Sequence, residues 1–375
     1  MKILIGTDRL SYSGIGIVTE EIARHLYERG YEVKIVCGKC DIKTKVPTIL
    51  CKYNNVLSQS DIVDVIKIIK QEEPDIFHSH YYPMDLCGAL INSSKIKHVM
   101  HSHGVNHQNW LFGWRNCMGL LRADIGEFLG VHLSKEIICV SNYMANELER
   151  KHRIKGDKVD VVYNTVDIMK FNPSIKGDEI REKYNISSGD LVLLCVATLA
   201  PVKRHSLLID CLRLIIKKKK NIKLLLVGGN GKTISRYKES MISKVHDAGL
   251  QDHVIFCGSI EENLPKYYAA SDLFVSASNS ETFGLPFIEA MACGKPVIGF
   301  DVTAISELII DGYNGYKVQD PNINEMATRI IQLADDTEER NRLGINGRLI
   351  ARENFNAEKN IEDTIKIYSK IISCH

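Results

Sequence analysis

Two glutamates stand eight residues apart in the stretch SETFGLPFIEAMACGKPV, residues 280–297. The Phe-Gly-Leu-Pro turn and the run FIEAMAC predict a loop that leads into a short helix, with Pro286 in its first turn and Gly294 just beyond its end. Glu281 then falls in the loop, and Glu289 falls about one turn inside the helix. A carboxylate accepts two hydrogen bonds side by side, which suits the vicinal hydroxyls of a ribose or a pyranose. The alternative for Glu281 is an acidic residue that stabilises the helix dipole.

Two other loops offer positive charge or backbone amides to an anion. In VATLAPVKRHSLLI, residues 196–209, Lys203 and Arg204 open a helix. A cation is unfavourable there unless an anion binds, so we predict phosphate binding at Lys203. In DRLSYSGIGIVTEEIARHL, Gly14 and Gly16 lie between a strand and a helix, where small residues let the backbone approach an anion. Glycine at such a turn often serves geometry alone, and both interpretations stay open.

The segment LLLVGGNGKT, residues 224–233, ends like a P-loop. The first glycine of that motif would fall at Leu226, inside a predicted strand, so we reject a P-loop nucleotidase. We expect Gly228, Gly229 and Gly231 to form a close turn near a nucleotide instead.

Two His-Ser-His triplets end two further predicted strands. Alternation puts His78 with His80, and His101 with His103, on single strand faces, an arrangement that could suggest zinc. No cysteine or acidic partner stands at ligand spacing, so we expect no metal. We expect His103 to contact sugar hydroxyls and the other three histidines to be structural.

Short apolar runs alternate with helical patterns along the chain, which is typical of parallel sheets built from βαβ units. One set of strands extends from KILIGT at residue 2 to KVDVVYN at residue 158, and a second from DLVLLCVA at residue 190 to KPVIGF at residue 295. NTVDIMKFNPSIKGD between them has linker composition. At 375 residues the chain is also long for one core. We predict an α/β protein with two doubly wound parallel-sheet domains that face each other across a cleft.

The composition is that of an ordinary globular protein, with 45% hydrophobic and 25% charged residues. A net charge of +2 provides no field for nucleic acid, which we exclude as a partner. The eleven cysteines are scattered and fit reduced thiols, and CGKC at 37–40 has no second CxxC for a metal site. The apolar run at the N-terminus is too short for a signal peptide and no stretch approaches the roughly 20 apolar residues of a membrane span, so we expect a cytoplasmic protein.

The block SETFGLPFIEAMACGKPV, followed by SELIIDGYNGYKV, closely resembles the E-x7-E signature of the retaining GT-B glycosyltransferases of family four. SGIGIVTEEIARHLYERGYEV resembles that family's N-terminal phosphate loop, HSHG its Thr/Ser-x-His-Gly loop, and LAPVK its phosphate-lysine segment. The resemblance covers nearly the whole chain. It implies a Rossmann-like acceptor-side domain at 1–168, a Rossmann-like nucleotide-sugar-binding domain at 169–355, and a helix at 356–375 that crosses back to the first domain.

The resemblance also assigns roles to individual residues. Glu281 and His103 would be catalytic, and Glu289 would hold the ribose. The donor sugar would contact Phe283, Gly284 and Leu285, and the donor diphosphate would contact Gly14, Gly16, Lys203 and Arg204. Thr198 stands where the family often has an arginine, so diphosphate binding depends on Lys203, with Arg204 as a compensating cation.

The implied activity is retaining transfer of a hexosyl unit from a UDP- or GDP-sugar to a hydroxyl of a glycan or lipid-linked acceptor, in glycan, glycolipid or polysaccharide synthesis. Cations and helix N-termini can stabilise the leaving diphosphate, so we expect neither a metal nor a cofactor. Residues 110–122, with Trp110, Phe112 and Trp114, could touch the inner face of a membrane, and internal packing is the alternative. A non-catalytic sugar-nucleotide or glycan-binding module remains the alternative to an enzyme.

Overall fold

The computed structural model describes residues 1–51, 59–91, 95–104, 117–229, 235–260 and 262–373. The chain divides into two compact units, one formed by residues 1–164 with 357–375 and the other by residues 165–356. No helix in these described ranges is both long enough and apolar enough to cross a lipid bilayer.

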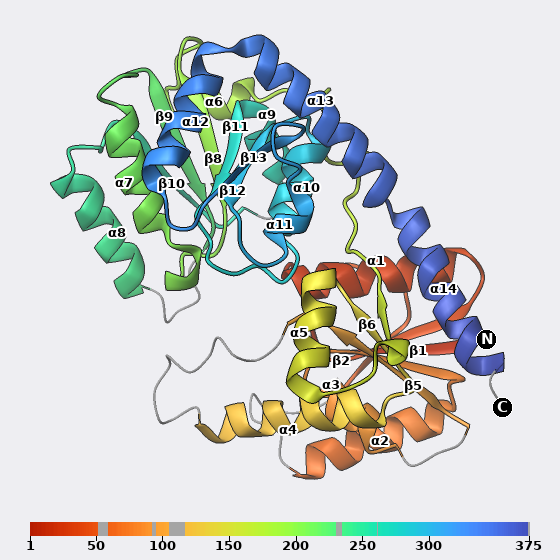
Figure 1. Cartoon of the computed structure of the whole chain (residues 1–375). Coiled ribbons are helices and arrows are strands. Elements are labelled where there is room, and N and C mark those ends of the chain that lie inside the picture. The colour runs from red at the N-terminus through yellow and green to blue at the C-terminus, as the bar shows by residue number, and fades with distance from the viewer. Residues whose placement is uncertain (52–58, 92–94, 105–116, 230–234, 261, 374–375) are drawn as a thin grey trace. The chain divides into compact units, whose positions relative to one another are not determined.

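The first unit contains a seven-stranded parallel sheet in the order β3-β2-β1-β4-β5-β6-β7. Its strands are β1 (Lys2–Leu10), β2 (Glu32–Cys40), β3 (Thr48–Leu50), β4 (Ile76–His80), β5 (Lys97–Ser102), β6 (Glu136–Cys139) and β7 (Val159–Val161). Its helices are α1 (Gly14–Glu28), α2 (Gln59–Glu72), α3 (Met84–Ala89), α4 (Cys117–Leu133), α5 (Asn142–His152) and α14 (Ala357–Ser373). Helices α2, α3 and α4 lie on one side of the sheet, and α1 and α14 lie on the other (Figure 1).

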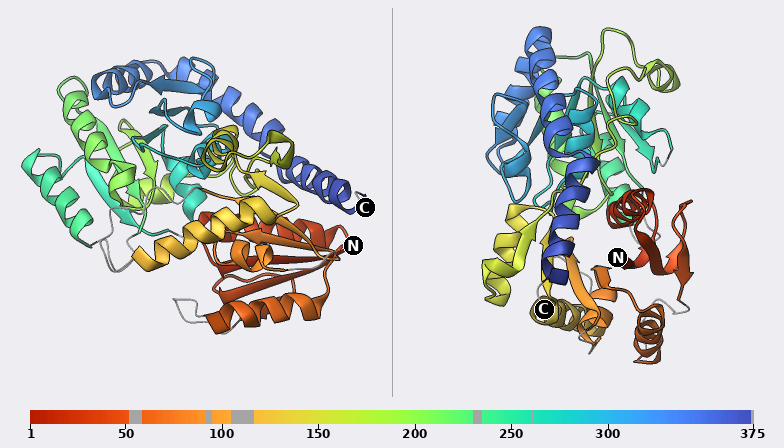
Figure 2. Two further views of the ribbon diagram at one scale, coloured as in Figure 1. Left: turned by 60° about the horizontal axis from the view of Figure 1, so that its bottom comes forward. Right: turned by 90° about the vertical axis from the view of Figure 1, so that its right-hand side faces the viewer.

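The last helix belongs to the first unit, so both chain ends lie there (Figure 2). The Tyr368 hydroxyl on α14 lies 2.6 Å from Nδ1 of His78 on β4. The Asn360 side chain donates to the Tyr163 carbonyl at 2.7 Å. Apolar residues along α14, including Ile361, Ile367 and Tyr368, are buried. This amphipathic pattern fixes the helix to the sheet.

The second unit contains a six-stranded parallel sheet in the order β10-β9-β8-β11-β12-β13. Its strands are β8 (Leu191–Val196), β9 (Ile222–Val227), β10 (Val254–Gly258), β11 (Leu273–Ser276), β12 (Val297–Phe300) and β13 (Gly315–Val318). Its helices are α6 (Asp178–Lys183), α7 (His205–Ile215), α8 (Ser235–Asp247), α9 (Leu264–Ala270), α10 (Leu285–Ala292), α11 (Ile305–Leu308), α12 (Ile323–Asp335) and α13 (Thr337–Asn354). Both sheets contain the six-strand order of a doubly wound Rossmann-like fold, and the first has one more edge strand, β7, so the prediction of two such domains is confirmed.

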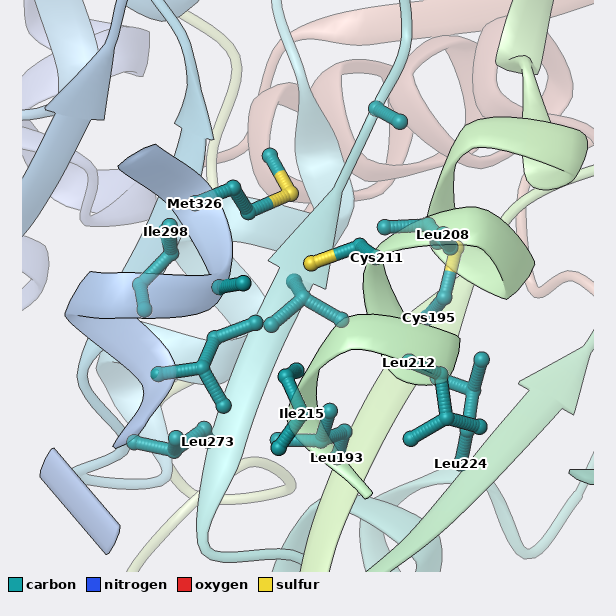
Figure 3. Close-up of a cluster of buried hydrophobic side chains, with 14 of the residues drawn as sticks. Leu193, Cys195, Leu208, Cys211, Leu212, Ile215, Leu224, Leu273, Ile298 and Met326 are labelled. Carbon is teal, nitrogen blue, oxygen red and sulfur yellow. The ribbon is translucent and has the colours of Figure 1, made fainter. Parts of the chain in front are cut away.

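One hydrophobic core of the second unit lies between its sheet and helices α7, α8 and α12. Figure 3 shows Leu212 and Ile215 of α7 beside Leu224 and Leu193 of the strands, and Leu208 of the same helix beside Cys195. The three α7 residues recur at helical spacing and are each at most 3% exposed, which explains why this segment forms a helix with one apolar face.

The segment after residue 164 is held by one arginine of α13. Arg348 donates to the carbonyl oxygens of Phe171 at 2.8 Å, of Ile168 at 3.3 Å and of Ala292. Burial lowers the pKa of the Arg348 guanidinium from its usual value. The predicted linker is therefore attached to the second unit through its backbone, from Thr165 onward.

Candidate active site

The carboxyl ends of β8 and β11 define the centre of the second unit's candidate site. These neighbouring strands lead to helices α7 and α10, which cover opposite faces of the sheet (Figure 1). Loops that diverge in this way leave a crevice at the strand ends, where ligands of doubly wound sheets bind. Lys203 ends a short 3-10 helix, Pro201–Lys203, between β8 and α7, and Arg204 is the N-cap of α7, so the predicted helix begins at His205. Glu281 lies in the loop after β11.

Lys203 and Glu281 form an ion pair at these strand ends. Lys203 Nζ donates to Glu281 Oε1 at 2.6 Å, and the two side chains are 21% and 16% exposed. The loops are also joined through their backbones, because the Asn279 amide donates to the Val202 carbonyl at 3.1 Å. The pairing of charges removes the repulsion that Glu281 alone would exert on an approaching phosphate.

The backbone of Glu281 is anchored by the loop after β12. Its N–H donates to Thr303 Oγ1 at 2.9 Å, and its carbonyl accepts from the Ala304 amide at 3.3 Å. Thr303 has a φ of 48°, in the left-handed region of backbone conformation that residues other than glycine rarely adopt. Three loops therefore fix the position of the Glu281 carboxylate.

Helix α10 begins and ends where the sequence predicts. Gly284 caps it with a φ of 106°, a conformation that favours glycine, and Pro286 lies in its first turn. Gly294 follows its end with a φ of 71°. Pro286 has no N–H, and the Phe287 N–H donates to the Gly284 carbonyl at 2.9 Å, so of the first three helical residues Leu285 supplies the N–H donor at this end of the helix. The Phe283 ring is buried edge-on against Phe355, at 5.7 Å between ring centroids.

Glu289 is held by Tyr268, which no pattern in the sequence singles out. The Tyr268 hydroxyl on α9 donates to Glu289 Oε2 at 2.6 Å and lies 3.2 Å from the Pro286 carbonyl. Burial and the neighbouring carboxylate raise the pKa of Tyr268 well above its usual value, so the phenol remains a donor. A buried tyrosine needs a hydrogen-bond partner, but the sequence alone does not identify it.

A cavity of about 540 Å³ lies at the carboxyl ends of β8, β9 and β10. Thr198, Leu199, Gly228, Gly229, Lys238, Phe256, Gly258 and Ser259 line it. Gly228 has a φ of 157°, and a Cβ there would lie 1.8 Å from the Ala197 carbonyl oxygen, so only glycine fits. Leu226 lies inside β9, as predicted, whereas Gly231 falls outside the described residues.

Arg204 has partners that differ from those of Lys203. Its backbone is left-handed, with a φ of 46°, and its Nη1 lies 2.8 Å from Asp320 Oδ1. The guanidinium also lies over the Phe300 ring, 5.4 Å from the centroid. The structure thus brings Lys203 to Glu281 and sends the next side chain toward β12 and β13.

The glycine loop of the first unit has a packing explanation. Helix α1 begins at Gly14, and its N-cap Ser13 accepts the Gly16 amide at 3.2 Å. A Cβ on Gly16 would lie 2.2 Å from the Ser11 carbonyl oxygen. Gly16 is therefore needed to bring the start of α1 against the loop, whether or not an anion binds there.

The four histidines of the two triplets lie together on one face of the first sheet. His80 and His101 are paired in register on β4 and β5. His80 Nδ1 lies 2.9 Å from His103 Nε2, and His101 Nδ1 lies 3.2 Å from His78 Nε2. Burial lowers the pKa of His78 and of His103 to about 3 and lowers those of His80 and His101 well below the usual value, so all four rings are neutral at pH 7.

Both units of the chain match known glycosyltransferase families. Residues 12–170 match the family described as Glycosyltransferase Family 4, and residues 176–350 match the family described as Glycosyl transferases group 1. The chain is 27% identical over 391 residues to N-acetyl-alpha-D-glucosaminyl L-malate synthase of Bacillus anthracis, and the aligned region covers 99% of this chain and 98% of the relative. It is 30% identical over 311 residues to an uncharacterized glycosyltransferase of Methanocaldococcus jannaschii, covering 81% of this chain and 78% of the relative.

Among solved structures, HepE of Anabaena in complex with UDP-glucose matches with a TM-score of 0.83 at 21% identity, over 99% of this chain and all of that one. The fold is that of the GT-B glycosyltransferases. The chain belongs to glycosyltransferase family 4.

Proposed function

We propose that this glycosyltransferase moves a hexosyl unit from a UDP- or GDP-sugar to a hydroxyl group of a glycan or lipid-linked acceptor, with retention of configuration. The observation that carries the proposal is the Lys203–Glu281 pair, which joins the segments that follow the neighbouring strands β8 and β11. The complex of HepE with UDP-glucose supports a nucleotide-sugar donor. The name of the Bacillus anthracis relative supports a hydroxyl acceptor, because it contains a glucosaminyl group joined to malate.

Charge development explains why a lysine and a helix N-terminus belong at this place. Cleavage of the bond between sugar and nucleotide leaves an oxocarbenium-like sugar and places negative charge on the diphosphate. One of the three N–H groups of Lys203 goes to Glu281, and we assign the other two to phosphate oxygens. The Leu285 N–H at the start of α10 stabilises the same charge. We therefore propose that transfer requires no divalent cation.

We assign the sugar, the ribose and the base of the donor to three neighbouring sets of residues. Glu281 holds hydroxyls of the donor sugar beside the amides of Phe283, Gly284 and Leu285. Glu289 holds the ribose diol, with one carboxylate oxygen fixed by Tyr268. The cavity lined by Gly228, Gly229 and Phe256 receives the base.

In the first unit, we assign His103 to a hydroxyl at the reacting centre. Retention then follows by attack of the acceptor on the face that the diphosphate leaves, with a phosphate oxygen taking the acceptor proton. A membrane contact through residues 110–122 remains a hypothesis. Residues 110–116 lie outside the described part of the chain, and of 117–122 only the helical backbone is described.

A thermal-shift panel of UDP-, GDP- and ADP-sugars tests donor binding on three proteins. Wild type should be stabilised by a UDP- or GDP-sugar, and Lys203→Ala should lose that shift. The matched control is Lys244→Ala, which removes a lysine paired with Asp210 at 2.7 Å in the same unit and should keep the shift. Equal shifts in all three proteins, or none with any sugar nucleotide, would contradict the proposal. Absence of nucleoside diphosphate release despite binding would favour a non-catalytic sugar-nucleotide-binding module.

A further inference from the structure

Five buried histidines of the first unit form hydrogen bonds whose donors and acceptors can be worked out. A neutral imidazole carries one N–H and one lone pair, so each ring has two tautomers. His80 and His101 each have one nitrogen, Nε2, that is buried and has no hydrogen-bond partner within the described residues. The tautomer of each ring decides whether this unpartnered atom is a proton donor or a lone pair.

The unpartnered atoms are best explained as lone pairs. A buried N–H without an acceptor is rarer in proteins than an acceptor without a donor. His80 and His101 therefore carry their protons on Nδ1. His80 Nδ1–H then donates to His103 Nε2 at 2.9 Å, and His101 Nδ1–H donates to His78 Nε2 at 3.2 Å. Because His103 Nε2 accepts a hydrogen bond, the proton of His103 lies on its own Nδ1.

His98, on the other face of the same sheet, gives the opposite result by the same reasoning. Its unpartnered buried nitrogen is Nδ1, and its Nε2 lies 2.9 Å from Ser79 Oγ. Ser79 donates its own proton to Asp85 Oδ1 at 2.6 Å, so His98 Nε2–H must be the donor to Ser79. His98 serves as an internal reference with the Nε2–H tautomer.

A metal ion explains this cluster less well. Ring nitrogens of His78, His80 and His101 lie within 4.8 Å of one another, which allows a zinc site to be considered. Both nitrogens of His78 are already engaged, Nδ1 with Tyr368 at 2.6 Å and Nε2 with His101. Only two unpartnered lone pairs remain among the three rings, whereas zinc sites use three or four protein ligands.

We propose that His80 is a positioning residue that fixes His103 as the Nδ1–H tautomer. His103 thereby meets a sugar hydroxyl as a hydrogen-bond donor and not as a base. This inference rests on the proposed function in assigning His103 to the reacting centre. The protonation of the ring itself can be measured without turnover, so the two proposals can fail separately.

The test is long-range ¹⁵N–¹H correlation spectroscopy of the full chain labelled with ¹⁵N-histidine at pH 7.5. The His103 signals are identified by their loss in His103→Gln. In wild type we expect protons on Nδ1 of His80, His101 and His103, and on Nε2 of His98. An Nε2–H tautomer at His103, or stoichiometric zinc by elemental analysis of the purified protein, would overturn the proposal. This wild-type spectrum decides the assignment even if a variant fails to fold.

Variants then test the positioning role. His80→Phe keeps an aromatic ring but removes the donor, so His103 should gain Nε2–H population and kcat should fall about tenfold with donor KM unchanged. His80→Gln retains an N–H donor and should restore both readouts toward wild type. His78→Phe, which removes a ring without a hydrogen bond to His103, should leave the His103 tautomer unchanged. An unchanged His103 tautomer in His80→Phe would show that His80 does not set it.

Discussion

The Lys203–Glu281 pair predicts a specific pattern in the binding of nucleoside diphosphate. Lys203→Ala removes the ammonium that we assign to the diphosphate and also leaves the Glu281 carboxylate without its partner. Glu281→Gln removes the negative charge with little change of shape. The double variant Lys203→Ala/Glu281→Gln removes both charges, and the four proteins form a double-mutant cycle.

The magnitudes follow from the geometry of the pair. A hydrogen bond to a charged group contributes about 1.5–3 kcal/mol, so loss of Lys203 should raise the Kd for UDP or GDP by roughly ten- to hundredfold. The orphaned Glu281 carboxylate, 16% exposed, then repels the diphosphate. Two unit charges about 4 Å apart repel each other by about 1 kcal/mol in water and by about 4 kcal/mol at the effective dielectric constant near a protein surface, and we take the lower value because the site is open to solvent. The double variant should therefore bind about fivefold more tightly than Lys203→Ala.

Isothermal titration calorimetry with UDP and with GDP measures all four corners of the cycle at low salt. Lys244→Ala again controls for the loss of a paired surface lysine. Two results would refute the reasoning: a Kd for Lys203→Ala within twofold of wild type, or strictly additive effects of the two substitutions. Additivity would mean that Glu281 lies too far from the diphosphate to sense it.

Four further outcomes are expected. Glu289→Ala should raise the donor KM by roughly ten- to hundredfold and leave kcat nearly unchanged, because a ribose contact is made alike in ground and transition states; steady-state kinetics with one donor would expose a kcat defect instead. Transfer should survive EDTA, and activity that needed added manganese would contradict the metal-free account. Gly16→Ala should lower the free energy of unfolding by about 1–3 kcal/mol, since its Cβ would lie 2.2 Å from the Ser11 carbonyl oxygen, whereas Gly189→Ala, where nothing lies within 4 Å, should not. His78 and His103 have a pKa of about 3 in the folded protein and stay neutral there, whereas the same histidines in the unfolded chain bind protons below about pH 6.5. The free energy of unfolding should therefore be highest above that pH and fall progressively as the pH drops toward 3. A urea midpoint that is equal at pH 7.5 and at pH 5 would contradict this.

Features set by neighbouring residues were predictable from the sequence. Pro286 and Gly294 mark the two ends of α10, because proline fits the first turn of a helix and glycine fits the left-handed position after its end. Strand alternation placed His78 with His80 on one face of β4, and the ring contact between them confirms it. The order of apolar runs likewise predicted two parallel sheets.

Pairings between distant segments were not predictable. Lys203 and Glu281 are 78 residues apart and meet only because β8 and β11 are neighbours in the sheet. Tyr268 reaches Glu289 from another helix, and Tyr368 reaches His78 from the other end of the chain. No local pattern encodes these contacts, because they depend on which strands pair.

Arg204 and Gly16 show how local patterns can suggest more than one role. The sequence offers Arg204 as a second phosphate cation, but a left-handed backbone and the Phe300 ring direct its guanidinium to Asp320. Gly16 suggested an anion loop, and its contact with Ser11 supplies a packing reason for glycine at the same position. Phosphate binding by either residue therefore remains a prediction, and Lys203 carries the stronger case.

Hydrolysis of UDP-glucose, followed by ¹H NMR from the first minutes, tests whether the protein cleaves a nucleotide sugar with retention, because water serves as the acceptor and no natural acceptor need be known. A GDP-hexose with an α-linked sugar is the second donor if UDP-glucose is not consumed. Retaining transfer should release nucleoside diphosphate together with the α-anomer of the free sugar, which appears before mutarotation mixes the anomers, and Lys203→Ala should lose both products. Initial release of the β-anomer would contradict retention, and consumption of neither donor by the folded protein would contradict the proposed reaction.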